Sequence, residues 1–302
     1  MAASRFIKDG GLTARMTLTM FLLGGLYVAL VAMVLLYVRS PGGAVVVALV
    51  AIGIAFWQWW SSDSVAMRAM RAREVTPQEA PELHGMIDRL CALADMPKPR
   101  VGVSDMAISN AFATGRSPDR AVVCVTTGIL HALDAEELEA VLAHELSHVA
   151  HRDVLVMTVA SSAGIAAGLL MRFAQFGGMS RSRNSGAAAA AMVSLLVSLV
   201  VYAVSFLLLR LLSRYRELSA DRAGAYLTMK PAALASALQK ISGQAAATPT
   251  RDLRSAGAAS ALCIVPALRG SGLGGLMATH PPLQQRLEQL ARIQAELSRP
   301  TG

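Results

Sequence analysis

Charged residues are scarce in this chain of 302 residues: Asp, Glu, Lys and Arg together make up 16%, against about 25% in a typical soluble domain. This deficit argues against an ordinary soluble protein and favours one that meets a membrane. The net charge of +8 comes from basic residues that flank apolar segments and form no continuous stripe. We therefore expect membrane-flanking anchors and no nucleic-acid partner.

Cysteine is also scarce, and Cys91, Cys124 and Cys263 are scattered without Cys-x-x-Cys spacing. This pattern supports neither a disulfide framework nor a cysteine metal site. We expect three ordinary core cysteines.

Two long uncharged runs lie near the N-terminus. Met16 to Val38 covers 23 residues, which at ~1.5 Å per residue is enough to cross a bilayer. Ala44 to Trp60 ends in three tryptophans, which suit a membrane interface. We predict a transmembrane hairpin over residues 16–60, after a cytoplasmic N-terminus at residues 1–15. Basic residues flank the hairpin on both sides, whereas its turn holds a single arginine, so both flanks are expected in the cytoplasm.

Two further uncharged runs, Val154 to Met171 and Ala187 to Leu209, predict a second membrane hairpin over residues 154–212. Serine, glycine and alanine in these runs suit helix packing in lipid. A buried helical hairpin in a soluble domain is the alternative, because both runs are rich in alanine.

The remaining residues, 61–153 and 213–302, are predicted to form two parts of one water-facing domain, mainly α-helical with a small β-sheet. Thr76-Pro77-Gln78-Glu79 has the pattern of a capping box with proline at the first helical position. Residues Arg100–Val103 and Ala121–Val125 are predicted strands because they are rich in β-branched residues.

A third strand is expected between those two, within Ser109–Gly115. Asp134, with Glu137 three residues later, predicts the start of another helix. Gln244–Gly275 is rich in Ala, Gly, Ser and Thr and is expected to be a mobile loop. An amphipathic helix is predicted over Pro282–Leu297.

The run His144-Glu145-Leu146-Ser147-His148 lies within the helix that Asp134 begins. Two histidines four residues apart project from one side of a helix, where they can bind one zinc ion at ~2.0–2.1 Å. Glu145 lies beside that site and can take a proton from the attacking water. The run therefore predicts a zinc-dependent hydrolase.

A catalytic zinc needs a third protein ligand, and the Glu217-Leu218-Ser219-Ala220-Asp221 segment offers one. Glu217 and Asp221 share a helical face, so Glu217 can ligate while Asp221 accepts a hydrogen bond from a ligating histidine. The alternative is a solvated surface pair beside Arg216 and Arg222, which the segment taken alone would favour. Two membrane crossings between His148 and Glu217 would return the chain to the same side, as a shared zinc requires.

The other histidines are weaker candidates. His151 shares the face of His144 but lies two turns away, so a ligand role is disfavoured. His280, before Pro281 and Pro282, fits an ordinary turn residue or an electrophile that reaches the site, and both remain open. His84 and His131 are expected to be surface or helix-end residues.

Nearly the whole chain resembles the HtpX-like family of membrane zinc metallopeptidases, which are relatives of the CAAX prenyl endopeptidases. The resemblance rests on the N-terminal hairpin, Ser109–Gly115, Thr126–Leu130, the His144–His148 run with His151-Arg152-Asp153 after it, the second hairpin, Glu217–Asp221 and His280-Pro281-Pro282. It implies a zincin-like (gluzincin) catalytic domain attached to transmembrane helices.

For the site, the resemblance implies one zinc ion per chain on His144, His148 and Glu217, with Glu145 as the general base. It also implies that Asn110, Ala111 and Phe112 form an edge strand, to which an extended substrate adds through main-chain hydrogen bonds. Asn110 and His280 are further candidates for stabilising the oxyanion.

For the cell, the resemblance implies a multi-pass protein of the bacterial cytoplasmic membrane, with the protease domain on the cytoplasmic side. Its expected substrates are membrane or misfolded polypeptides, in a stress response and in membrane protein quality control.

Three rival functions are less favoured. An intramembrane protease carries the same run inside an apolar span, but this helix contains Asp134, Glu136 and Glu137, and lipid penalises a central Asp by ~2.5–3.5 kcal/mol. A non-enzymatic membrane scaffold is disfavoured because all three ligands and Glu145 are intact. A CAAX-type endopeptidase is a closer rival, but four spans are too few to enclose its large chamber.

Overall fold

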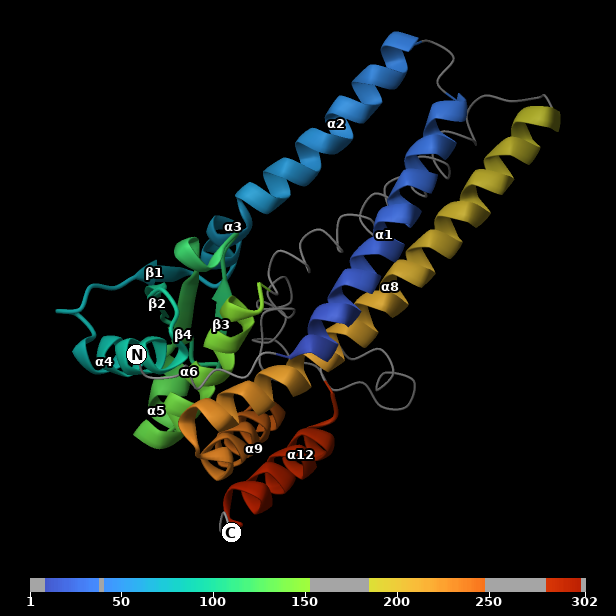
Figure 1. Cartoon of the computed structure of the whole chain (residues 1–302). Coiled ribbons are helices and arrows are strands. Elements are labelled where there is room, and N and C mark those ends of the chain that lie inside the picture. The colour runs from blue at the N-terminus through green and yellow to red at the C-terminus, as the bar shows by residue number, and fades with distance from the viewer. Residues whose placement is uncertain (1–8, 38–40, 153–184, 248–280, 300–302) are drawn as a thin grey trace. The chain divides into compact units, whose positions relative to one another are not determined.

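The computed structural model describes residues 9–37, 41–152, 185–247 and 281–299, which are the coloured parts of Figure 1. The helices are α1 (Gly10–Tyr37), α2 (Pro41–Trp60), α3 (Ser62–Ala69), α4 (Pro81–Ala94), α5 (Thr127–Ala132), α6 (Ala135–Ala150), α8 (Ser185–Thr228), α9 (Pro231–Ala247) and α12 (Leu283–Leu297), with a 3-10 turn at Pro118–Arg120. The strands are β1 (Ala72–Glu74), β2 (Arg100–Ser104), β3 (Ala111–Thr114) and β4 (Val122–Thr126). The described residues are therefore mainly helical with one small sheet, as predicted.

The chain divides into two compact units. One contains residues 1–13, 61–155 and 213–302, and the other contains residues 14–60 and 156–212. Helix α8 contributes residues to both units, so the chain passes from one to the other inside a regular helix.

The sheet belongs to the first unit and has the strand order β1-β2-β4-β3. Strands β2 and β4 are parallel, with Arg100 opposite Val122, and the two outer pairs are antiparallel. Every residue of β4 is buried, which suits its run of valines in the middle of a sheet. Strand β3 lies at an edge, so among the described residues one side of its backbone pairs with no strand.

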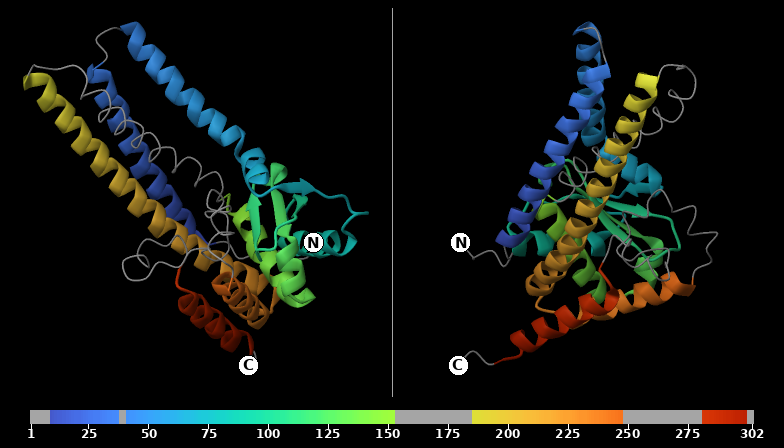
Figure 2. Two further views of the ribbon diagram at one scale, coloured as in Figure 1. Left: turned by 180° about the vertical axis from the view of Figure 1, so that it is seen from behind. Right: turned by 90° about the vertical axis from the view of Figure 1, so that its right-hand side faces the viewer.

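The core of this unit lies between the sheet and its helices. Helix α6 packs on β3, β4, α4 and α9, and α9 packs on α12; these elements can be followed in Figures 1 and 2. The core residues Ile87, Val123, Ile129, Leu142 and Leu238 have no exposed surface. Helix α6 therefore passes through the centre of the core, which holds its side chains in fixed directions.

In the second unit, α1 and α8 lie side by side in Figures 1 and 2, with Leu23, Leu26 and Tyr27 of α1 against Leu208 and Leu209 of α8. Among the described residues, one helical segment, Gly10–Ala29, has the length and apolar composition needed to cross a membrane. The third predicted run and the connector after it lie outside the described residues.

The predicted helix start at Pro77 is wrong, because α4 begins at Pro81. The Thr76 amide and hydroxyl both hydrogen-bond Glu79, at 2.7 and 3.0 Å, but they close a turn. Ala80 precedes a proline, which disfavours the α conformation, and its φ of −140° and ψ of 64° are not helical.

Two other expectations need correction, and one strand was not expected. The mobile loop was predicted to begin at Gln244, but Gln244 lies in α9, which continues to Ala247. Residues 248–275 of the predicted loop lie outside the described part. His84 is not a surface residue, because it is buried and its Nε2 lies 3.0 Å from the Val75 carbonyl. Strand β1 was not predicted, because three residues with two charges show no alternation, as is common at sheet edges.

The described cysteines agree with the expectation of core residues. Cys91 and Cys124 are buried free thiols, and burial raises their pKa values to about 11 and about 12. Cys263 lies outside the described residues.

Candidate metal centre

Helix α6 begins with the predicted capping box. Asp134 accepts a 2.9 Å hydrogen bond from the Glu137 amide, and Glu137 accepts one of 3.0 Å from the Asp134 amide. The box fixes where the helix starts, and the core contacts fix its rotation. As a result His144 and His148 are both buried on one side, with their rings 4.9 Å apart and perpendicular.

Helix α8 brings Glu217 to the two histidines. Its carboxylate oxygens lie 3.6 Å from Nε2 of His144 and 3.5 Å from Nε2 of His148. These distances are too long for good hydrogen bonds. Two ligands of a tetrahedral zinc, each ~2.0–2.1 Å from the ion, lie about 3.4 Å apart. The ligand atoms of the three residues all lie within 4.8 Å of one another, so the spacing fits a zinc ion between them.

Asp221, one turn after Glu217, faces the other nitrogen of His144. Its Oδ1 lies 3.0 Å from Nδ1, so the Nε2 atom points towards Glu217, as expected for a histidine oriented by a carboxylate. The alternative of a solvated surface pair is therefore excluded, since both Glu217 and Asp221 are buried.

Arg286 of α12 completes this arrangement and was missed by the sequence analysis. Its Nε and Nη2 donate to the two oxygens of Asp221 at 2.7 and 2.6 Å. The signal was present, because Arg286 shares the apolar face of its helix with Leu290 and Ile293, at i+4 and i+7. An arginine on a buried face requires a buried acidic partner.

The buried carboxylates of Glu217 and Asp221 favour binding of a cation at this site. Burial lowers the pKa of His144, but Asp221 and Glu217 outweigh burial and raise that pKa to about 9. Burial raises the pKa of Asp221, but the guanidinium of Arg286 outweighs it and holds that pKa below its ordinary value. The donors and their charge thus both suit a zinc ion.

Helices α6 and α8 approach closely beside His144. A Cβ on Gly224 would lie 2.9 Å from the His144 amide nitrogen, so only glycine fits there without movement of the backbone. The Ser147 hydroxyl donates to the His144 carbonyl at 2.6 Å. These contacts set the separation of the helices that carry His144 and Glu217.

Glu145 is buried, and burial raises its pKa above the ordinary value. Its carboxylate hydrogen-bonds the backbone amide of Ala113 in β3. An acidic side chain with a raised pKa, next to a metal-ligand cluster, is a suitable general base.

Strand β3 presents alternate backbone groups to its open edge. The Asn110 carbonyl accepts the Thr126 amide at 3.0 Å. By the alternation of an antiparallel pair, Phe112 also bonds towards β4, whereas Ala111 and Ala113 face outwards. The bond from Ala113 to Glu145 agrees with this alternation. Ala113 was missed by the sequence analysis, because only the register reveals which amides face the edge.

The remaining predicted residues are placed as follows. Asn110 is buried directly before β3, and its amide donates to the Thr126 hydroxyl at 3.0 Å. Phe112 is buried against Met70 and Cys124. His151 ends α6. His280 lies outside the described residues.

Comparison with known proteins identifies the family of this chain. Residues 77–294 match peptidase family M48. The chain belongs to this family. It is 55% identical to Protease HtpX homolog 1 of Streptomyces coelicolor over 298 residues, covering 97% of this chain and 96% of that protein. It is 48% identical to Protease HtpX homolog of Moorella thermoacetica, covering 96% and 97%.

A solved structure shows a similar fold. The crystal structure of S. mikatae Ste24p aligns with 91% of this chain and 64% of that one, at 18% identity and a TM-score of 0.52. With the M48 assignment, the chain is a zinc metallopeptidase, and its HtpX relatives indicate a membrane-associated one.

Proposed function

We propose that this M48 peptidase is a membrane-bound, zinc-dependent endopeptidase of the HtpX type that hydrolyses membrane or misfolded polypeptides in membrane protein quality control. The observation that carries the proposal is the buried cluster of His144, His148 and Glu217 beside the buried carboxylate of Glu145. The catalytic unit is proposed to be zincin-like, of the gluzincin class, because two histidines of one helix join a glutamate of another.

In this proposal His144, His148 and Glu217 hold one zinc ion per chain, while Asp221 orients His144. When bound, the zinc ion supplies Lewis-acid chemistry: it lowers the pKa of water towards ~7 and polarises a carbonyl. Glu145 takes the proton of the attacking water and delivers it to the leaving amine. Its buried position, next to His144 in the helix that carries both histidines, supports this role.

The substrate is proposed to lie extended along the segment Asn110, Ala111 and Phe112. The position of β3 at a sheet edge supports this, as do the outward groups of Ala111 and of the following Ala113. The proposed role of Phe112 is limited to its backbone, because its side chain is buried. Asn110 and His280 remain proposed partners of the oxyanion.

We propose that residues 1–15 form a cytoplasmic N-terminus and that residues 16–60 and 154–212 form two membrane hairpins. Residues 61–153 and 213–302 together form the protease domain. The chain's division into compact units near these boundaries supports it. Apolar residues exposed on α1, α2 and α8, such as Phe21, Trp57 and Leu207, support membrane contact. We place the protein in the bacterial cytoplasmic membrane as a multi-pass protein, with the protease domain in the cytoplasm.

The decisive experiment compares Glu145→Gln with wild type. The full chain is purified in detergent, its zinc content is measured, and cleavage of fluorescent casein is followed with and without a zinc chelator. We expect about one zinc per chain in both proteins and a fall in kcat of ~10²–10⁴-fold in the variant. Cleavage by the variant at the wild-type rate would falsify the proposal.

Glu139→Gln is the matched control, because Glu139 lies on the same helix and forms surface ion pairs with Arg89 and Lys230. Such pairs contribute about 0–1 kcal/mol, so this variant should cleave at the wild-type rate. The quality-control role is tested by comparing membrane proteomes of cells with wild-type enzyme and with Glu145→Gln. Membrane proteins that accumulate only with the variant support it, and identical proteomes contradict it.

A further inference from the structure

Helix α8 makes a second polar contact on the side opposite the metal-ligand candidates. The Ser219 hydroxyl donates a hydrogen bond of 2.8 Å to the carboxylate of Asp9, 210 positions earlier in the chain. Ser219 is buried and lies two residues from both Glu217 and Asp221, a rotation of about 200° around the helix. One side of α8 therefore carries the metal-site carboxylates, and the other side bonds Asp9.

Asp9 also fixes the start of α1. Its Oδ1 accepts the Leu12 amide at 2.8 Å, which is the bond of a helix N-cap. A Cβ on Gly11 would lie 2.9 Å from the Tyr215 hydroxyl, and Tyr215 is one turn before Ser219 on the same face of α8. The first turn of α1 and Asp9 before it therefore contact α8 at Tyr215 and Ser219, which are one helical turn apart.

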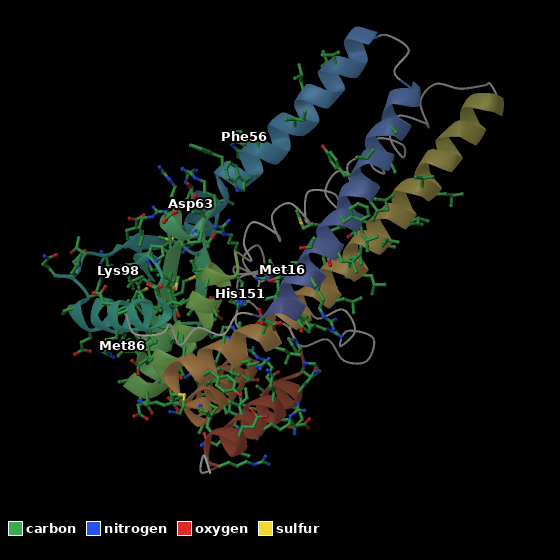
Figure 3. All side chains as sticks on the ribbon, viewed as in Figure 1. Met16, Phe56, Asp63, Met86, Lys98 and His151 are labelled. Atoms are coloured by element: carbon green, nitrogen blue, oxygen red, sulfur yellow. The ribbon has the colours of Figure 1, made fainter. Side chains whose placement is uncertain are left out.

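The charge of Asp9 also acts on the end of α6. His151 ends α6, three residues after His148, and is labelled in Figure 3. Burial raises the pKa of Asp9, but its hydrogen bonds and the charges of Arg222 and His151 outweigh burial and hold that pKa below its ordinary value. An ionised carboxylate makes stronger hydrogen bonds than a neutral group.

We propose that Asp9 is a positioning residue for the metal centre: its bond to Ser219 fixes the rotation of α8 and thereby the distance of Glu217 from His144 and His148. The inference rests on the proposed function. A working metal site needs its ligands held within about 0.5 Å, and a rotation of α8 displaces Glu217 directly. Within the described part of the chain, the side chain of Asp9 hydrogen-bonds Leu12 and Ser219 and none of the three proposed ligands, so it acts through Ser219.

The test uses full-length, zinc-loaded enzyme and the variants Asp9→Ala, Ser219→Ala and the double variant. For each, kcat and KM on fluorescent casein, the rate of zinc loss to a chelator and the unfolding midpoint are measured. We expect each single variant to lower kcat and speed zinc loss by about tenfold, the factor for one hydrogen bond to a charged group. KM should stay within about twofold, because substrate contacts are intact.

The double variant separates positioning from independent effects. If both residues act through one bond, it should have the kcat of either single variant. A kcat about a hundredfold below wild type would mean independent effects and overturn the inference. So would unchanged kcat and zinc loss with only a lower unfolding midpoint, since that is the result expected of a simple helix cap.

Two further variants complete the design. Asp9→Asn keeps a good N-cap residue, and its amide nitrogen, in the place of Oδ2, can donate to the Ser219 hydroxyl. This neutral contact is weaker than the one with a carboxylate, so the variant should recover part of the lost kcat, and no recovery contradicts the inference. Ser236→Ala is the matched control, because it removes a serine–carboxylate bond of 2.6 Å to Glu137 and should leave kcat unchanged.

The outcomes remain separable. If Asp9→Ala does not fold, Ser219→Ala still decides the matter, because alanine suits a helix interior. If wild type shows no cleavage that chelation or Glu145→Gln abolishes, the proposed function fails. If wild type cleaves and the Asp9 and Ser219 variants match it, only this inference fails.

Discussion

Arg286 and Asp221 form a bidentate ion pair inside the protein, with side chains 2% and 0% exposed. The pair also leads to the metal site. Asp221 lies 3.0 Å from Nδ1 of His144, and a guanidinium nitrogen of Arg286 lies 3.7 Å from Glu217. Arg286 therefore balances the negative charge that orients His144.

Replacing Arg286 with methionine should destabilise the fold and weaken zinc binding. The change leaves Asp221 buried without its cationic partner, which costs about 3–5 kcal/mol. Loss of an orienting contact behind a metal ligand lowers metal affinity by about 10–100-fold. Denaturant unfolding measures the first effect, and competition with a chelating dye measures the second.

Arg292→Met is the control for that change, because Arg292 is exposed on the same helix. It should alter the free energy of unfolding by no more than about 0.5 kcal/mol. Equal zinc affinity in Arg286→Met and Arg292→Met would contradict the role given to Arg286.

Gly224→Ala should separate α6 from α8. Its new methyl group would meet the His144 backbone at 2.9 to 3.2 Å, and backbone cannot turn aside as a side chain can. We expect a loss of about 1–3 kcal/mol of stability and a lower zinc content after dialysis, measured by unfolding and by metal analysis.

Gly243→Ala makes the same chemical change in a helix where nothing lies within 4 Å of the added atom. It should stabilise the protein by about 0.4–1 kcal/mol. If Gly224→Ala behaved in the same way, the close approach at His144 would not constrain the helices.

Glu137 should make stability depend on pH. Burial raises its pKa, but hydrogen bonds from Lys240 and Ser236 and the Asp134 amide outweigh burial and lower that pKa below 4.5. A lowered folded-state pKa means that the contribution is complete above the unfolded value of about 4.3 and is lost as pH falls through the folded value.

Thermal unfolding from pH 7 to pH 3 measures this effect. Glu137→Gln should have a lower midpoint than wild type at pH 7, and the difference should shrink below about pH 4.3, where the unfolded glutamate is protonated. A constant difference at every pH would show that the charge of Glu137 does not contribute.

Ala113→Pro tests recognition by the strand backbone. The Ala113 amide faces away from β4, so proline removes no bond of the sheet and removes one outward donor, which also hydrogen-bonds Glu145. We expect KM for casein to rise by about tenfold, the factor for one lost hydrogen bond, and kcat to fall as well, because Glu145 loses the same donor.

Phe112→Leu is the comparison for that variant, because the Phe112 side chain is buried in the core. It should lower the unfolding midpoint and keep KM within about twofold. A large rise in KM for Phe112→Leu, or none for Ala113→Pro, would contradict recognition through the outward amides.

Local features of the site could be predicted from the sequence. The capping box at Asp134 and Glu137 spans three residues, and His144 and His148 are one helical turn apart. A helix has a fixed period, so the shared face of the two histidines follows from their spacing alone. The same reasoning put Glu217 and Asp221 on one face, but it could not exclude a solvated pair.

Other features required the tertiary structure, because they join residues that are distant in the chain. Arg286 meets Asp221 across 65 positions, and Asp9 meets Ser219 across 210; no periodicity links such pairs. The sequence by itself determined the metal-binding motifs and the helix that carries His144, Glu145 and His148. Only the packing of α6, α8 and α12 decided that the carboxylates of α8 are buried beside them, because burial depends on what covers a residue and not on its neighbours in the chain.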